Sequence, residues 1–161
     1  MKMRGEQMSM VQTVFYAVVL SVIGSQLPDV FECGVMSEAV FRGIGSLLFF
    51  SSYFWDEWSQ NGMVGKKWEG LELFGWVSYV IQASVIKSVL PFVIFGVIGT
   101  LLITIELVLQ IKYGEGKQER VWLFENILWI GGLIISIWWV PWILIVLSTS
   151  FVICGMFWIR R

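Results

Sequence analysis

A few charged residues interrupt otherwise apolar sequence, and these are the residues that could carry chemistry. Glu106 is the sharpest case, because every other residue of Leu101–Leu109 except Thr104 is apolar. A carboxylate in hydrocarbon is costly, so such residues mark ion paths, proton relays or buried pairs. Glu106 could bind a proton or a cation. Its role could instead be structural, because it lies about 8 Å from the end of the expected span and its carboxylate could reach water there. It could also bond Gln110, four residues later on the same helix face. The shallow depth favours a structural role.

Two cations interrupt apolar sequence in the same way. Lys87 has a long stem that can carry its amine to the headgroups on the outer side, and Glu38 or Asp29 could act as its counter-ion. Arg42 lies about one turn into an apolar segment, four residues after Glu38. A glutamate four residues before a cation suits an ion pair on one helix. Structural roles are the favoured interpretation for both cations, and intramembrane functional charges are the alternative.

Tryptophan is abundant, with ten residues in a chain that is 16% aromatic. The indole ring favours the boundary between lipid and water, where its N–H meets a polar partner. The sequence therefore predicts interfacial anchors. They are Trp138, Trp139 and Trp142 on the outer side, and Trp122 and Trp158 on the inner side.

Several kinds of site are unsupported. Histidine is absent, which removes His-ligated haem, His-containing zinc sites and Ser-His-Asp triads. Cys33 and Cys154 are the two cysteines, and they form no Cys-x-x-Cys pair. We therefore expect no catalytic residues, no bound metal and no cofactor, and we expect no enzyme activity. The net charge of −1 gives no reason to expect a nucleic-acid partner.

The composition points to a membrane. The chain has 161 residues, of which 57% are hydrophobic and 14% charged, and its mean hydropathy is +0.77. Soluble domains carry about 25% charged residues. Because a short chain has much surface for its volume, the missing charge cannot be explained by a larger soluble core. Lipid is the simplest environment for this surface.

The apolar segments predict an all-α, polytopic membrane bundle that forms a single integral domain over 1–161. Spans are expected at about 8–27 and 39–55, separated by a polar turn at 28–34. Two longer runs follow at 71–111 and 121–159. Each is about 60 Å long as one helix, twice the thickness of a bilayer core. Each run is either one long helix kinked at its proline, Pro91 or Pro141, or a helical hairpin that turns there.

The distribution of Lys and Arg favours hairpins. With about six spans as three hairpins, nearly all cations fall on the side of the termini, and Arg42 and Lys87 alone lie toward the outer side. Four spans with two long helices would weaken this asymmetry and would place the indoles of residues 138–142 near the bilayer middle. We therefore expect six spans with both termini cytoplasmic.

Minor polar features are expected to be structural. Gly75, Ser78 and Gln82 form one stripe that suits helix packing. Glu125, beside Asn126, is expected to complement a helix dipole near an N-terminus. Close helix contacts, within the bundle or with a partner, are expected at small residues four apart. These pairs are Ser21 with Ser25, Gly96 with Thr100, Gly132 with Ser136, and Ser150 with Cys154.

Short polar loops, abundant apolar surface and the lack of a catalytic set favour a non-enzymatic role. The expectation is an accessory, assembly or structural subunit of a larger membrane protein complex, with membrane lipids and other membrane subunits as partners. The alternative is a small transporter or channel that uses Glu106 and Lys87 in its pathway.

Overall fold

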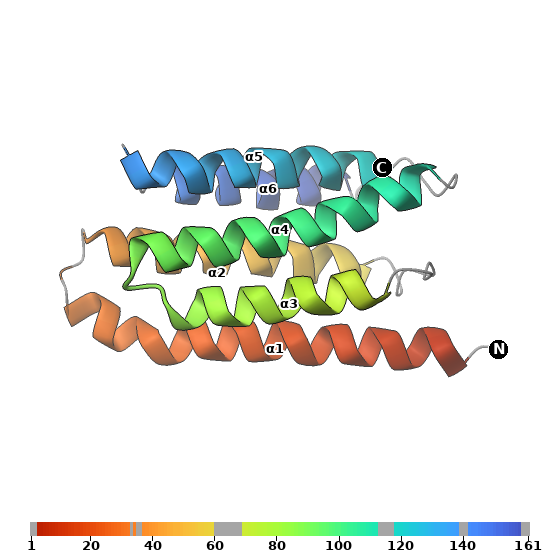
Figure 1. Cartoon of the computed structure of the whole chain (residues 1–161), viewed down its shortest axis with the longest axis horizontal. Helices are drawn as coiled ribbons and strands as arrows, with labels where there is room; N and C mark the ends of the chain where they lie inside the picture. The colour runs from red at the N-terminus through yellow and green to blue at the C-terminus, as the bar shows by residue number, and fades with distance from the viewer. Residues whose placement is uncertain are drawn as a thin grey trace.

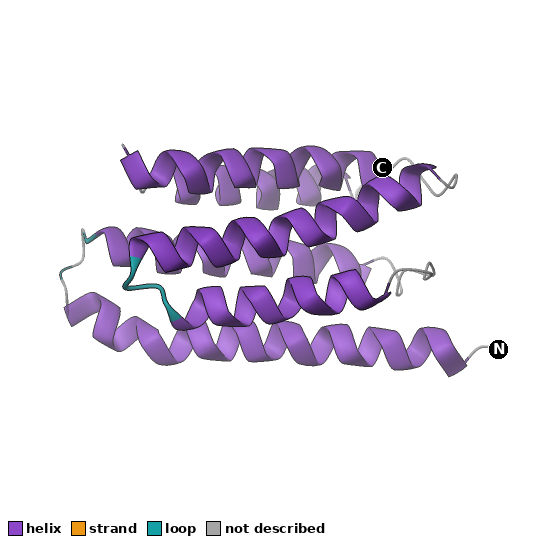
Figure 2. Ribbon diagram, viewed as in Figure 1, coloured by secondary structure: helices purple, strands orange, loops and turns teal. Residues whose placement is uncertain are grey.

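The computed structural model of the chain describes residues 3–32, 34, 37–59, 69–112, 118–138 and 142–158. Within these ranges the regular structure is entirely α-helical, with no strand, so the predicted all-α class is confirmed (Figures 1 and 2). Six helices are present in the described ranges. They are α1 (Met3–Glu32), α2 (Glu38–Ser59), α3 (Glu69–Ser84), α4 (Val89–Lys112), α5 (Gln118–Trp138) and α6 (Ile143–Trp158).

The apolar run at 71–111 forms two helices, as the hairpin interpretation predicts. Between α3 and α4 the backbone turns over residues 85–88, where the Val85 N–H donates to the Gln82 carbonyl and the Ser88 N–H to the Val85 carbonyl. Pro91 is the third residue of α4. The first N–H groups of a helix have no partner in that helix, so proline costs little there.

The second long run also divides into two helices. α5 ends at Trp138 and α6 begins at Ile143, and the two helices pack against each other. Pro141, where the turn was predicted, lies outside the described residues. Neither long run is therefore a single kinked helix.

The polar turn predicted at 28–34 starts later than expected. α1 continues through Pro28 to Glu32, and Gly34 follows with a φ of 104°. The reason lies in packing, because Val30, two residues beyond the proline, is fully buried in the bundle. Proline is tolerated inside a helix when neighbouring helices hold the chain in place.

The helices pack side by side in a closed ring with nearly parallel axes (Figure 1). Around the ring the order is α1, α2, α6, α5, α4 and α3, and α3 returns to α1. Both chain ends lie at one end of the bundle, which we call the terminus end. The opposite end carries Gly34, residues 85–88 and Trp142, and we call it the turn end.

Aromatic side chains fill the middle of the ring. Phe49 of α2 stacks on Trp129 of α5 with ring centroids 4.1 Å apart. Phe49 also makes edge contacts with Tyr79 of α3 at 6.3 Å and with Phe151 of α6 at 6.1 Å. One side chain thus bridges three other helices, so the ring is a packed core at this level.

Glycines allow the closest helix approaches. A Cβ on Gly75 would lie 3.2 Å from the carbonyl oxygen of Gly99, and one on Gly99 would lie 3.0 Å from that of Gly75, so α3 and α4 meet backbone to backbone. The predicted small pairs on α4 and α5 are buried. Ser21 and Ser25 are exposed on α1, so a close contact there would need another protein. The side chain of Cys154 lies outside the described ones.

Two helices of the described chain are long and apolar enough to cross a membrane. The segments are Val14–Glu32 in α1 and Val89–Leu109 in α4. Trp122–Trp138 and Ile143–Ile153 are apolar but shorter. These lengths suggest membrane association, although a core helix of a soluble protein or a signal sequence can have the same properties.

Candidate functional site

Arg42 joins α2 to the α3–α4 turn by hydrogen bonds at the turn end of the bundle. Its residue is 3% exposed, so the guanidinium lies inside the bundle one turn from the start of α2. Its Nε donates to the Ile86 carbonyl at 2.7 Å, and Nη2 donates to the Lys87 carbonyl at 3.3 Å. The carbonyls after a helix C-terminus have no partner in the helix. Arg42 therefore supplies donors to the turn that follows α3.

Two ion pairs surround this contact. Arg42 Nη1 lies 3.5 Å from the carboxylate of Glu38, four residues earlier on α2. Lys87 Nζ lies 3.0 Å from the carboxylate of Asp29 on α1. The side chains of Lys87 and Asp29 are 48% and 64% exposed, and exposed pairs contribute between about 0 and 1 kcal/mol. Arg42 and Lys87 are thus brought together, in an arrangement that ties α1, α2 and the α3–α4 turn.

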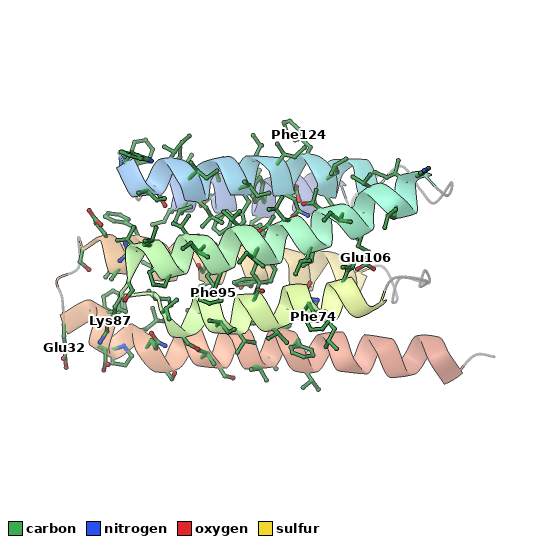
Figure 3. The ribbon with its side chains drawn as sticks, in the orientation of Figure 1. Glu32, Phe74, Lys87, Phe95, Glu106 and Phe124 are labelled. Carbon is green, nitrogen blue, oxygen red and sulfur yellow. The ribbon has the colours of Figure 1, made fainter. Side chains whose placement is uncertain are left out.

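Glu106 lies far from this cluster. Figure 3 places Lys87 at the turn end and Glu106 toward the terminus end. The helical rise from Val89, the first residue of α4, to Glu106 is about 26 Å. Glu106 is 5% exposed, so it is enclosed by the bundle, whereas a side chain reaching directly to water would be exposed. The side chain of Gln110, its expected neighbour, lies outside the described ones.

A second buried carboxylate stands at the level of Glu106. α4 and α5 are in contact and run in opposite directions (Figure 1). Glu106 is about 9 Å from the end of α4, and Glu125 is about 10 Å from the start of α5. Glu125 is 7% exposed and Asn126 is fully buried. The helix-dipole interpretation of Glu125 fits poorly, since that effect fades beyond the first turn.

A satisfied hydrogen-bond chain crosses from α3 to α4. The Tyr79 hydroxyl donates to Thr100 Oγ1 at 3.0 Å, and the Thr100 hydroxyl donates to the Gly96 carbonyl at 2.7 Å. All three residues are buried. These hydrogen bonds fix the position of α3 against α4, and they give the hydroxyl groups of Tyr79 and Thr100 a partner each.

Gln82 is different, because its amide has no such partner. The residue is fully buried, and neither Nε2 nor Oε1 has a hydrogen-bond partner among the described residues. The same holds within that set for Ser46 Oγ and Trp129 Nε1. The amide packs directly against Gly96 of α4. Sequence reasoning placed Gln82 in a packing stripe, and its position in an apolar run was the signal that could have singled it out.

The predicted tryptophan anchors have different surroundings. Trp138 and Trp142 are 78% and 53% exposed at the turn end, where anchors are expected. Trp122 is 7% exposed, so it packs inside the bundle and offers little surface to a headgroup. Trp139 lies outside the described residues, and so does the side chain of Trp158.

The chain shows no likeness to known proteins that could transfer a function to it. Comparisons with protein-family models, with curated proteins and with solved structures gave no match. Among the described residues, no group of three or more Cys, Asp or Glu side chains could hold a metal ion. The arguments for function therefore rest on the bundle itself.

Proposed function

We propose that the chain is a membrane-embedded accessory or structural subunit, whose outer face is covered by lipid and by other membrane proteins. The observation that carries the proposal is the exposure of large apolar side chains on five of the six helices, α1, α3, α4, α5 and α6, among the described side chains. Phe124, labelled in Figure 3, points away from the bundle and is 61% exposed. Other examples are Val14 (52%) and Phe31 (43%) on α1, Phe74 (65%) on α3, Ile94 (45%) on α4, Ile127 (55%) on α5 and Val146 (48%) on α6.

Several charged and amide side chains within the helices have the opposite distribution. Arg42, Gln82, Glu106, Glu125 and Asn126 are all buried. A helix in water turns its polar face outward, whereas polar residues in membrane helices face the bundle interior. Apolar groups outside and polar groups inside suit lipid as the solvent.

The arrangement of the helices supports six crossings with both termini cytoplasmic. An even number of antiparallel helices returns the chain to the terminus end, the side to which the sequence assigns most Lys and Arg. α3 and α6 have 16 residues each, or about 24 Å. A bilayer core is about 30 Å thick, so flanking residues or local thinning must complete these two crossings.

Two features favour a scaffold over a conducting pathway. Phe49 and its ring partners fill the centre of the ring. Lys87 and Glu106, the charges expected along a pathway, lie at opposite ends, and Lys87 is engaged with Asp29. Transport remains the second candidate function, because Glu106 and Glu125 form a buried acidic level in the bundle.

Purification tests the proposed function. The tagged full chain is expressed at its native level, and the membranes are washed with alkaline carbonate. The washed membranes are then extracted in a mild detergent, and the chain is isolated by its tag. We expect the chain to resist carbonate and to elute in a stoichiometric complex with another membrane protein. Release by carbonate would refute the membrane location. A self-contained oligomer that conducts ions in liposomes would favour the transport function.

A further inference from the structure

We propose that the Gln82 amide and the Ser46 hydroxyl bind one internal water molecule that joins α3 to α2. This site follows from the bundle geometry and is independent of the subunit's function. Its ligand is small, uncharged and able both to donate and to accept hydrogen bonds. The argument depends on where the two side chains lie, on their unmet hydrogen bonds, and on the chemistry they offer.

Contacts on either side place Gln82 and Ser46 at one level. α2 and α3 run in opposite directions (Figure 1), and Arg42 reaches the Ile86 carbonyl between them. Ser46 is four residues after Arg42, and Gln82 is four residues before Ile86. Positions four apart on a helix share a face and differ by about 6 Å along the axis, so Ser46 lies one turn beyond Arg42 on α2. Gln82 lies in the last turn of α3, which ends at Ser84, so both side chains lie on the terminus-end side of that contact.

The next level confirms the alignment. Phe50, four residues after Ser46, meets Tyr79, three residues before Gln82, with ring centroids 4.8 Å apart. The Ser46–Gln82 level is thus bounded by an arginine–carbonyl contact toward the turn end and by an aromatic contact toward the terminus end. α2 and α3 have other helices as their main neighbours in the ring, and these bridges join them across it.

Ser46 differs from three other buried serines among the described residues, Ser52, Ser136 and Ser148. Ser52 and Ser136 donate to the carbonyl of the residue three positions earlier, each at 2.7 Å, and Ser148 donates to the carbonyl of Leu144. A serine in an apolar helix usually satisfies its hydroxyl in this way. Ser46 does not, although it is 1% exposed, so its hydroxyl is available to a ligand.

The unmet groups match water. The amide of Gln82 supplies donors and an acceptor, and the hydroxyl of Ser46 supplies one donor and accepts as well. A water molecule donates twice and accepts twice, and buried waters serve polar groups that lack protein partners. A metal cation would need more oxygen ligands, and the buried carboxylates Glu106 and Glu125 lie at least two turns away. Complete burial and the close contact with Gly96 restrict the ligand to a very small molecule.

A double-mutant cycle tests the site in the purified full chain in detergent. Gln82→Met keeps the length of the side chain and removes the amide, and Ser46→Ala removes the hydroxyl. We expect each change to lower Tm by a few degrees, and the double variant to lose no more than the worse single variant, because one shared water is lost each time. Ser52→Ala is the matched control, and its loss should add to that of Gln82→Met.

Two results would overturn the proposal. A rise in Tm for Gln82→Met would mean that the amide has no ligand in the native protein, and strictly additive losses would mean that no ligand is shared. NMR provides a readout that does not depend on the variants' stability. The wild-type Gln82 side-chain NH₂ should show a cross-relaxation peak with a long-lived water, and a spectrum without that peak would reject the site.

Discussion

Arg42→Met gives the sharpest test of how the turn end is held. Methionine keeps most of the side-chain length and its packing, and it removes the charge and every donor. The buried guanidinium now serves the Ile86 carbonyl at 2.7 Å and the Lys87 carbonyl at 3.3 Å. Without it, the carbonyl of the fully buried Ile86 loses its side-chain donor. We expect a destabilised chain that keeps its helices.

The magnitude follows from these contacts. A hydrogen bond from a charged donor contributes about 1.5–3 kcal/mol, and the longer of the two bonds contributes less. Removing a buried charge returns part of that loss, because its desolvation cost disappears. The ion pair with Glu38 adds little, since the Glu38 side chain is 64% exposed. The net loss is about 2 kcal/mol, which corresponds to a Tm lower by about 4–8 °C in a chain of this size.

Thermal unfolding of the purified chain in detergent, followed by circular dichroism, measures this loss. Glu38→Gln is the matched control, and it should cost less than about 0.5 kcal/mol because it removes only the exposed pair. An unchanged Tm for Arg42→Met would refute the role given to the guanidinium. So would a Glu38→Gln loss as large as that of Arg42→Met, because the ion pair would then be the main contribution.

Three further predictions concern other parts of the bundle. Glu106→Gln should leave folding and complex assembly intact by size-exclusion chromatography; lost ion flux in liposomes with normal expression would instead favour transport. Gly45→Ala should cost about 1–3 kcal/mol, because its Cβ would lie 2.8 Å from a side-chain atom of α6 and 3.1 Å from its backbone. Gly131→Ala has open space at its Cβ and should stabilise the chain by about 0.5–1 kcal/mol. Equal changes in the free energy of unfolding for Gly45→Ala and Gly131→Ala would contradict the close packing of Gly45 against α6. Trp138 and Trp142, studied as the only tryptophans, should be quenched by shallow lipid probes and spared by probes at the bilayer centre.

The helical layout could be predicted because it depends on local properties of the sequence. Apolar runs of 40 residues exceed one bilayer thickness, and the charge distribution favoured a turn in the middle of each, near Pro91 and Pro141. The end of α1 could not be predicted. Proline and a group of polar residues indicate a turn at Pro28, and the helix continues because Val30 is buried by other helices. That burial depends on helices distant in sequence.

The candidate sites could be predicted only in part, for a similar reason. The pairing of Glu38 with Arg42 follows from their spacing on one helix. The carbonyl partners of Arg42 and the meeting of Ser46 with Gln82 depend on how α2 faces α3, across more than 30 residues of intervening sequence. Local spacing carries no information about that pairing. For Glu125, a helix-terminus role was the natural local interpretation, and its burial follows from the contact of α5 with α4.

Cysteine labelling from the two sides of the membrane tests the central claim, that antiparallel helices of this bundle cross a bilayer. Cys33 and Cys154 are first replaced by serine, and single cysteines are then placed at Ser88, in the turn between α3 and α4, and at Gly114, between α4 and α5. A membrane-impermeant maleimide is applied to sealed vesicles of each orientation. The six-crossing arrangement predicts that Ser88→Cys reacts only from the outer side and Gly114→Cys only from the cytoplasmic side. Reaction of both cysteines from the same side would contradict it, because α4, the most apolar long helix, would then not cross the membrane.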